Sequence, residues 1–408
     1  MNLIDEIPNR MAENAAFFWL LHDKALAGSD YDLSEMVELE LRIQAQLDGL
    51  LSYKEDGWQA CLTALQFDEP GEIFTAAYFA FASGDSQKIQ LAVEAGCNKQ
   101  ENFSAMLSAL AWLPFASIQN WLGKLMQSTL PEHLCLGLCA CALHRANCGE
   151  HLTKILAGGY LDSSPEYLSL TLRAISLMQN DNAQYDLSKY HAHSEEGVVF
   201  SSLYTSLKQG DGNAMSLIRN YVFSDTKIND ISVTDKAIQV VFRVLPAEEA
   251  KKWIQDLGKE PDSLRTVIKS IAILGDPTVL PWLLKLMAQD ETARLAGNAF
   301  SLITGLDLEL EKMVKRVTDS DEMDENTLEE PDSDFPWPDA AKISAWYALN
   351  SGHFLYGNRY LAGKLISEEQ CTAVLSHGKQ SHRIAAYHEL SIMGSNSVFN
   401  ENPKRLRI

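Results

Sequence analysis

Apolar residues recur along the chain with the spacing of one face of an α-helix. The clearest stretch is 262–274, where they follow the order i, i+3, i+4, i+7 and i+10: Leu264, Val267, Ile268, Ile271 and Leu274. Residues with this spacing lie on one side of a helix and pack against a neighbour. The run Gly275-Asp276-Pro277 then predicts a helix end and a new start, because glycine ends helices and proline suits a first turn.

Two more helices follow from the same pattern. One has its stripe at Val279, Leu283, Leu286 and Met287, and the next runs from Glu291 to about Thr304. Comparable turn signals recur upstream, spaced by roughly 30 residues: Gly84-Asp85, Pro114-Phe115, Cys148-Gly149, Asn180-Asp181, Gly210-Asp211 and Pro246-Ala247. Such a drifting period is typical of solenoids built from helical pairs. We therefore predict a HEAT-like α-solenoid over residues 67–306.

Signals for β-strands are scarce in this sequence. The β-branched pair Val240-Val241 is a candidate, but together with Ala237 and Val244 it forms a helical stripe. We therefore predict the all-α fold class.

Three regions lie outside the predicted repeats. Residues 1–66 carry two longer helices, at about 9–26 and 33–51, and we expect them to cap the first repeat, whose core needs cover. Residues 307–336 form an acidic linker, because 319–334 is dense in carboxylates and holds no lysine or arginine. Residues 337–408 form a C-terminal segment of two or three helices.

The charge and the cysteine content narrow the possible partners and compartment. The chain has 408 residues and a formal net charge of −21, which argues against nucleic acids and anionic membranes as partners. The apolar run 15–21 follows acidic residues and is broken by His22-Asp23-Lys24, so it predicts an amphipathic helix rather than a signal peptide. Seven cysteines, an odd number, suit a reducing cytoplasm.

The sequence CLGLCACALHRANCGEH at 135–151 poses a choice between a metal site and a helix interior. On one continuous helix, Cys141 and His151 would lie roughly 15 Å apart, too far for a single zinc ion to bind both. Cysteine is also among the most buried residue types and packs as a small hydrophobe. We interpret the stretch as helix interior, and we predict no metal and no cofactor.

Other candidate sites lack part of the pattern that their chemistry needs. His191 and His193 could share an ion but have no third ligand nearby, and the acidic run lacks the glycine of a calcium-binding loop. Residues 357–365 resemble a stretched phosphate-binding loop, with Leu365 in place of the magnesium-binding Ser or Thr. We therefore predict no catalytic residue.

Three blocks of sequence resemble one bacterial family of HEAT-like repeat proteins. They are AENAAFFWLLHDKAL with LRIQAQLDGL and PGEIFTAAYFAF (12–81), GDPTVLPWLLKLM with ARLAGNAFSLITGLDL (275–308), and WPDAAKISAWYALNSGHFLYGNRYLAGKLI with VLSHGKQSHRIAAYHELSI (337–392). Genes of this family are often found beside the spike and spike-tip genes of type VI secretion. The resemblance implies a HEAT-like fold and an accessory role near effector loading, and it implies no catalytic residue.

The expected function is a protein-binding scaffold, because a solenoid offers a long surface to another protein. Together with the family resemblance, the expected function is that of a cytoplasmic adaptor or chaperone-like accessory for a type VI secretion effector or spike protein. One alternative is an immunity protein that neutralises a toxin. Another is a metal-dependent enzyme on a solenoid scaffold, although HEAT-fold iron hydroxylases carry repeated His-Glu pairs and this chain has only His388-Glu389.

Candidate partner-binding residues are concentrated in the C-terminal segment. Aromatic side chains and arginine are enriched at binding hot spots, and we single out five: Trp337, Arg359, Tyr360, Lys379 and Arg383. The last four are expected to be exposed, because Gly357-Asn358 and Gly378 place them near turns. The expected partner is another protein, with no binding to nucleic acid or membrane.

Overall fold

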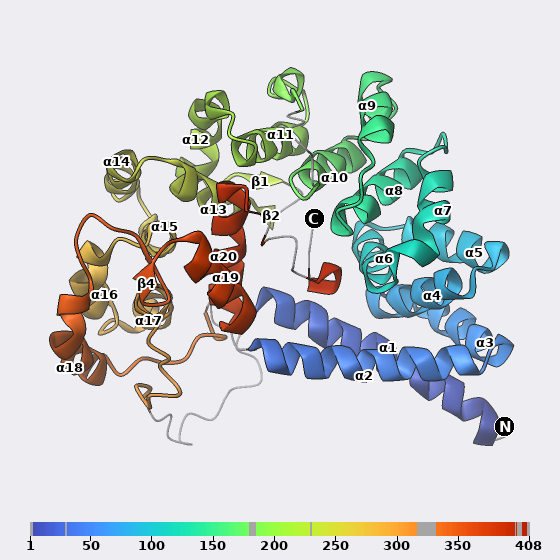
Figure 1. Ribbon diagram of the computed structural model, residues 1–408, viewed down its shortest axis with the longest axis horizontal. Coiled ribbons are helices and arrows are strands. Elements are labelled where there is room, and N and C mark those ends of the chain that lie inside the picture. Colours follow the sequence, from blue (N-terminus) through green and yellow to red (C-terminus); the bar gives the residue numbers. More distant parts are fainter. Residues whose placement is uncertain are drawn as a thin grey trace. The chain divides into compact units, whose positions relative to one another are not determined.

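Helices dominate the protein (Figure 1). The computed structural model describes residues 3–28, 31–178, 185–228, 231–315, 332–395, 397 and 402–405. Within these ranges the β-structure amounts to an isolated bridge and two antiparallel hairpins of two-residue strands: β1 (Lys227–Ile228) with β2 (Ile231–Ser232), and β3 (Tyr360–Leu361) with β4 (Lys364–Leu365). The predicted all-α class is confirmed.

The chain divides into two compact units. Unit 1 comprises Met1–Ala27, Ser34–Gln209 and Phe399–Ile408, and unit 2 comprises Gly28–Leu33 and Gly210–Val398. The division at 209–210 falls inside the predicted repeat region, and the predicted C-terminal segment contributes to both units.

Unit 1 is built from helices. Its elements are α1 (Leu3–Ala27), α2 (Leu33–Ser52), α3 (Glu55–Ala64), η1 (Leu65–Phe67), α4 (Pro70–Ser83), α5 (Ser86–Gly96), α6 (Gln100–Trp112), α7 (Phe115–Leu125), α8 (Pro131–Leu143), α9 (Gly149–Ala157), α10 (Pro165–Ile175), η2 (Ser188–Tyr190), α11 (Glu196–Lys208) and η7 (Pro403–Arg405). The helices predicted at 9–26 and 33–51 are confirmed as α1 and α2.

A row of buried helices forms the core of unit 1. Helices α4, α6, α8, α10 and α11 each pack on the next, while α5, α7 and α9 pack on this row from outside it. The difference is encoded in the sequence: α8 is apolar on nearly all sides and buried from Leu134 to Leu143, whereas α7 buries only Ile118 and Leu122. A helix with a single apolar stripe stays at the surface, and one that is apolar all round becomes core.

Unit 2 repeats this arrangement and adds the C-terminal helices. Its elements besides the hairpins are η3 (Gly212–Ala214), α12 (Met215–Phe223), α13 (Thr234–Val244), α14 (Ala247–Leu257), α15 (Leu264–Leu274), η4 (Pro277–Val279), α16 (Leu280–Leu286), α17 (Asp290–Thr304), α18 (Ala340–Asn350), η5 (Ser351–His353), α19 (Glu368–His377) and α20 (Gln380–Met393). The helices predicted around 264–304 are confirmed as α15, α16 and α17. Leu264 itself is 41% exposed, because it is the first residue of its helix.

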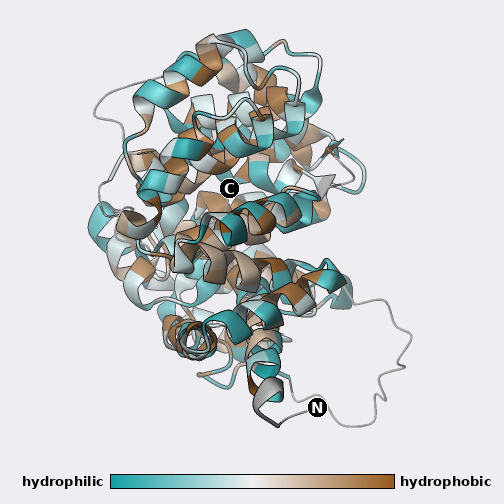
Figure 2. Ribbon diagram, turned by 90° about the vertical axis from the view of Figure 1, so that its right-hand side faces the viewer, coloured by the Kyte–Doolittle hydropathy of each residue, from teal (hydrophilic) through white to brown (hydrophobic). Residues whose placement is uncertain are grey.

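In unit 2 the helices of residues 210–306 pack with those of the C-terminal segment. Helices α12, α13, α15 and α17 pack in sequence, α14 covers α15, and α20 packs on α13 and α19. Side chains of α16, α17 and α18 share one apolar cluster that includes Leu283, Phe300 and Ile343. Along the helical ribbons, hydrophobic and hydrophilic residues alternate at short intervals (Figure 2), which is the pattern of amphipathic helices that bury one side.

The described ends of the predicted acidic linker belong to unit 2 and contact its helices. Residues 316–331 of the linker lie outside the described residues. Arg265 donates two hydrogen bonds to the Asp332 carboxylate, at 2.6 and 2.7 Å, and the Asp332 side chain is only 10% exposed. At Asp332 the predicted acidic linker is therefore not a solvated segment, because Arg265 Nη2 donates to both oxygens of this carboxylate and holds it in place.

Candidate protein-binding surface

Hairpin β3–β4, in the middle of the predicted recognition residues, caps the end of α15. The last carbonyls of a helix lack a partner inside the helix. Here the Tyr360 N–H donates to the Gly275 carbonyl at 2.8 Å, while the Arg359 guanidinium donates to the carbonyls of Leu274 (2.8 Å) and Ile273 (3.3 Å). A cation at the C-terminus of a helix also interacts favourably with the helix dipole. Arg359 and Tyr360 thus complete the end of α15.

The same hairpin caps α17 through its turn. The Ala362 N–H donates to the Leu302 carbonyl at 2.8 Å, and the Gly363 N–H donates to the Ile303 carbonyl at 3.0 Å. Gly305, which ends α17 with a φ of 72°, lies so close that a Cβ there would be 2.7 Å from the Ala362 backbone. The stretch that resembles a phosphate-binding loop therefore makes its backbone contacts with helix ends of its own chain.

A buried cluster of three charges fixes the orientation of Arg359. Its Nη2 donates to Glu389 Oε1 at 2.6 Å, and Arg243 Nε lies 3.1 Å from the same oxygen. The side chains of Arg243 and Glu389 are 1% and 4% exposed. A buried carboxylate is stable only with such partners, so Glu389, the acidic member of the His388-Glu389 pair, serves to hold α13, α20 and the hairpin together.

The expectation that Tyr360 and Arg383 are exposed is wrong. Tyr360 is 5% exposed, with its ring packed edge-on against Phe354 and its hydroxyl accepting from the Leu355 N–H at 2.8 Å. Arg383 is 3% exposed and donates to the Leu375 carbonyl and to Gln380 Oε1, both at 2.8 Å. A neighbouring turn predicts a change of direction, but here the turns themselves dock onto other elements and cover these side chains.

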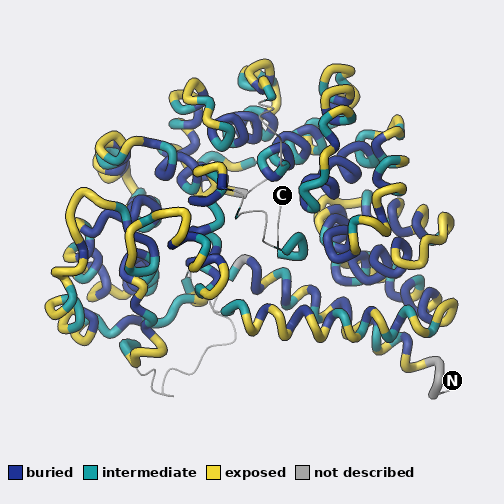
Figure 3. The backbone as a smooth tube through the Cα atoms, in the orientation of Figure 1, coloured by how far each residue is buried: buried dark blue, intermediate teal, exposed yellow. Residues whose placement is uncertain are grey.

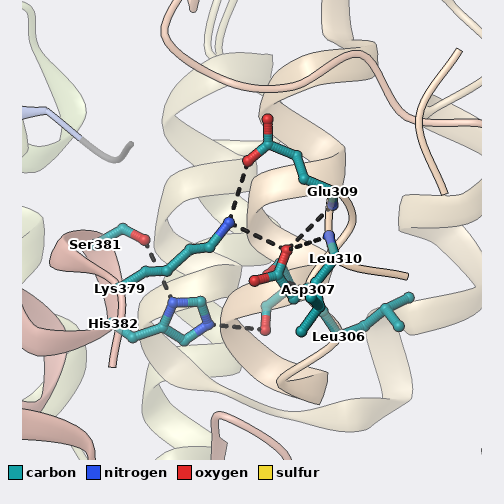
Figure 4. Close-up of polar contacts among 8 residues, drawn as sticks. Leu306, Asp307, Glu309, Leu310, Lys379, Ser381 and His382 are labelled. Carbon is teal, nitrogen blue, oxygen red and sulfur yellow. Dashed lines mark hydrogen bonds and ion pairs between the residues drawn. The ribbon is translucent and has the colours of Figure 1, made fainter. Parts of the chain in front are cut away.

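Lys379 lies at the start of α20 and forms ion pairs with the segment that follows α17 (Figure 4). Its Nζ is 3.1 Å from Asp307 Oδ1 and 3.2 Å from Glu309 Oε2. Burial alone would raise the pKa of Asp307, but the Leu310 N–H and Lys379 outweigh it and hold that pKa below its ordinary value. Lys379 is thus half-buried and engaged within unit 2, rather than free at the surface as expected.

His382, one turn further along α20, stabilises the same contact (Figure 4). Its Nε2 lies 3.1 Å from the Ser301 carbonyl of α17 and its Nδ1 lies 3.4 Å from Ser381 Oγ. Burial lowers the pKa of His382, so the imidazole is neutral at physiological pH. Its ring nitrogens serve the packing of α20 on α17.

Trp337 lies beside two cations. The Arg294 guanidinium is 4.9 Å and the Lys315 ammonium 5.3 Å from its ring centroids. Cation–π contacts of this kind join the segment before α18 to α17 and to the segment after α17. Each of the five predicted residues thus has contacts within its own unit, and a role for them in partner binding stays a prediction.

Three large apolar side chains near the end of α18 and in the segment before β3 are highly exposed. Leu349, Leu355 and Tyr356 are 85%, 61% and 73% exposed, and we name them the 349–356 surface. Figure 3 shows much of this segment in the colour of exposed residues. Tyr347 lies near Tyr356. Burial raises the pKa of Tyr347, and the proximity of Tyr356 raises it further.

This surface is held on an ordered base. Ile343 anchors α18 in the core with 0% exposure, and Phe354, 8% exposed, packs against Tyr360. The Leu355 backbone is tied to the Tyr360 hydroxyl. Because these neighbours point inward, Leu349, Leu355 and Tyr356 are left in water. The sequence carries a signal for this: AAKISAWYALN is apolar on several sides of α18, although the helix buries only Ile343.

The cysteine-rich stretch 135–151 is not one continuous helix, although the distance between Cys141 and His151 was derived for one. Helix α8 ends at Leu143, and Cys148 is the N-cap of α9, so the chain turns between them. The interior interpretation is confirmed for Cys135, Cys139 and Cys141, which are at most 3% exposed within α8. Cys148 is also buried and forms a hydrogen bond with Cys141, and this bond and burial raise the pKa of the Cys141 thiol.

Metal-ligating side chains are dispersed over the part of the chain that the structure describes. No three or more His, Cys, Asp or Glu residues gather there in a way that would hold an ion. His191 Nε2 lies 3.2 Å from Ser206 Oγ, and His193 Nδ1 accepts from the Glu195 N–H at 3.0 Å. The acidic run that was compared with a calcium-binding loop lies, before residue 332, outside the described residues.

No protein-family model, no curated protein and no solved structure matches the chain. Among the described residues, no helix combines the length and the apolar character that crossing a bilayer requires.

Proposed function

We propose that this protein is a protein-binding scaffold that engages its partner through the 349–356 surface. The observation that carries the proposal is the exposure of Leu349, Leu355 and Tyr356, 61–85%, on a backbone that is otherwise well anchored. Isolated apolar residues are normal on a protein surface, whereas large exposed apolar side chains that gather in one patch mark an interaction site. The three residues here lie close together in the sequence. Tyrosine in particular is enriched at binding hot spots.

The anchored backbone favours tight binding. Association loses free energy when flexible side chains and loops are ordered, so a surface whose neighbours are already fixed loses less. Here Phe354 and Tyr360 fix the segment before a partner arrives. Covering the three exposed side chains then stabilises the complex by about 25 cal/mol for each Å² of apolar area removed from water.

We further propose that the fold is a HEAT-like α-solenoid and that the partner is a type VI secretion effector or spike component, bound in the cytoplasm. The row of buried helices in each unit, flanked by amphipathic ones, supports the solenoid. The resemblance of the three sequence blocks supports the partner class, and the 349–356 surface falls within the third block. On this proposal the protein is an adaptor that delivers its partner.

The test is capture of the partner with a matched pair of variants. The tagged full-length chain, the variant Leu349→Ser/Leu355→Ser/Tyr356→Ser and a control variant are incubated with extract of the native cells, and bound proteins are identified by mass spectrometry. The control, Phe17→Ser/Leu20→Ser, removes two exposed apolar side chains of α1, 57% and 44% exposed. Both variants should melt at the temperature of the wild type, because only exposed groups change.

We expect a spike or effector protein to be enriched by the wild type and the control and lost with the triple variant. A toxin domain in its place would mean that the protein confers immunity. Equal enrichment by all three proteins would refute the role of the 349–356 surface. Stoichiometric iron or zinc in the purified protein would instead favour an enzyme.

A further inference from the structure

The C-terminal residues form a compact basic element on unit 1. Pro403–Arg405 make one 3₁₀ turn, η7, which packs against α6. Asn402 closes this turn: its side-chain oxygen accepts from the Lys404 N–H at 3.1 Å, and its carbonyl accepts from the Arg405 N–H at 2.9 Å. The element therefore holds its shape through its own hydrogen bonds and presents two adjacent cations.

Arg405 binds a carboxylate that has little access to water. Its Nε donates to Glu40 Oε1 at 2.7 Å and its Nη2 donates to Glu40 Oε2 at 3.1 Å, although the two residues are 365 positions apart. The two side chains are 12% and 9% exposed. A bidentate pair of this geometry is selective for arginine, since the planar guanidinium matches both carboxylate oxygens.

Lys404 and Arg405 occupy adjoining parts of one site made by α1, α2 and α6. Lys404 Nζ lies 4.3 Å from a ring centroid of Trp112 on α6, a cation–π contact. The Trp112 ring meets the His22 ring edge-on at 5.4 Å, and His22 Nε2 lies 3.5 Å from Glu40 Oε1. A carboxylate for one cation and an aromatic face for the next are what recognition of a Lys-Arg dipeptide requires.

We propose that Glu40, His22 and Trp112 form a recognition site for a Lys-Arg segment of a partner protein, and that residues 402–405 occupy this site as an internal competitor. The net charge of −21 favours a partner with a basic segment, since opposite charge steers association. The internal segment is tethered, so its effective concentration is high and a partner must displace it. This inference does not depend on the 349–356 surface.

The test measures binding of the tail in trans by fluorescence anisotropy. The probe is a labelled peptide of residues 400–408, NENPKRLRI, and the proteins are the full-length wild type and the full-length variant Lys404→Ala/Arg405→Ala. We expect the variant to bind the peptide at least about tenfold more tightly than the wild type, because its own tail no longer competes. A peptide with alanine in place of its Lys-Arg pair should not bind. This control changes only the peptide, so it does not depend on the folding of another protein variant.

A third protein tests the site itself. Adding Glu40→Gln to the double variant should abolish binding of the peptide. Comparison with the alanine peptide shows whether the lost binding depends on the Lys-Arg pair. Equal binding of the peptide by wild type and double variant would overturn the proposal, as would equal binding of the alanine peptide. Loss of the native melting transition in the double variant would also overturn it, because the tail would then be part of the fold. None of these outcomes bears on the 349–356 surface.

Discussion

Glu389 shows how a residue in the candidate region is committed to the fold. Its carboxylate is 4% exposed and is shared by Arg243 and Arg359. From the sequence, an exposed arginine near Gly357-Asn358 was a reasonable expectation, because turns lie at surfaces. The buried counter-charge that draws Arg359 inward lies 30 residues away, and no local pattern reveals it.

Substitution Glu389→Gln should destabilise unit 2 by about 3 kcal/mol or more, because it removes a carboxylate that pairs with the buried Arg243 guanidinium. The matched control is Glu38→Gln, which removes an ion pair with Arg42 whose side chains are 64% and 57% exposed. The control should change the free energy of unfolding by less than about 1 kcal/mol. Urea denaturation followed by tryptophan fluorescence measures both, and equal losses would contradict the assignment of the cluster.

Glu40 makes the stability of unit 1 dependent on pH. Burial alone would raise its pKa, but hydrogen bonds with His22 and Arg405 lower it from 4.5 to about 2. A carboxylate whose pKa is depressed in the folded state contributes stability above its ordinary pKa and loses that contribution as the pH falls through the folded value. The contribution of Glu40 is therefore complete above pH 4.5 and disappears toward pH 2.

We expect Glu40→Gln to be less stable than the wild type at pH 7 and the difference to shrink as the pH falls below 4.5. Melting temperatures recorded from pH 7 down to about 3 test this expectation. A difference that stays constant over the whole range would show that the ionised form of Glu40 contributes no stability.

At the scale of elements, the helices followed from the sequence and the hairpin did not. The apolar stripe of 264–274 and its Gly-Asp-Pro end correspond to α15 and η4 because periodicity and end signals are local properties. Hairpin β3–β4 is positioned by backbone N–H groups that donate to carbonyls at helix ends about 60 to 85 residues away in the sequence. Every residue except proline has a backbone N–H group, so the pairing of these groups leaves no trace in the pattern of side chains.

The close approach of the hairpin to α15 predicts an unusual cost at one glycine. Gly275 and Gly394 both end helices with nearly equal φ, 72° and 69°, but a Cβ at Gly275 would lie 2.5 Å from the Tyr360 carbonyl oxygen, whereas Gly394 has nothing within 4 Å. Gly394→Ala should cost about 1 kcal/mol, from the left-handed backbone alone. Gly275→Ala should cost at least about 2 kcal/mol more, because the backbone of β3 must move.

Thermal unfolding of the two glycine variants, each compared with the wild type, provides the measurement. If both variants lose the same stability, the hairpin does not pack against the end of α15 as described.

At the scale of the whole molecule, composition and periodicity predict the fold class. They do not predict which side chains remain exposed at the surface. The sequence predicts binding through Arg359, Tyr360, Lys379 and Arg383. The structure favours Leu349, Leu355 and Tyr356 instead, within the same C-terminal region. The reason is that the first four side chains contact other residues of unit 2, whereas the last three remain exposed to water. Which residues of an apolar segment are left uncovered depends on what packs around them.

Because the 349–356 surface contributes little to the fold, substitutions there should separate binding from stability. The single variant Tyr356→Ser should leave the melting temperature within about 1 °C of the wild type and lower affinity for the captured partner by about 2 kcal/mol, as for other hot-spot residues. Isothermal titration calorimetry measures the affinity. A variant that binds as tightly as the wild type would remove Tyr356 from the interface.

The most direct test of the protein-binding proposal is hydrogen–deuterium exchange of the full-length chain with and without the captured partner. We expect slower amide exchange in residues 345–358 when the partner is bound, and unchanged exchange in α1 around Phe17 and Leu20. Protection confined to other parts of the chain, with 345–358 exchanging as in the free protein, would contradict the account.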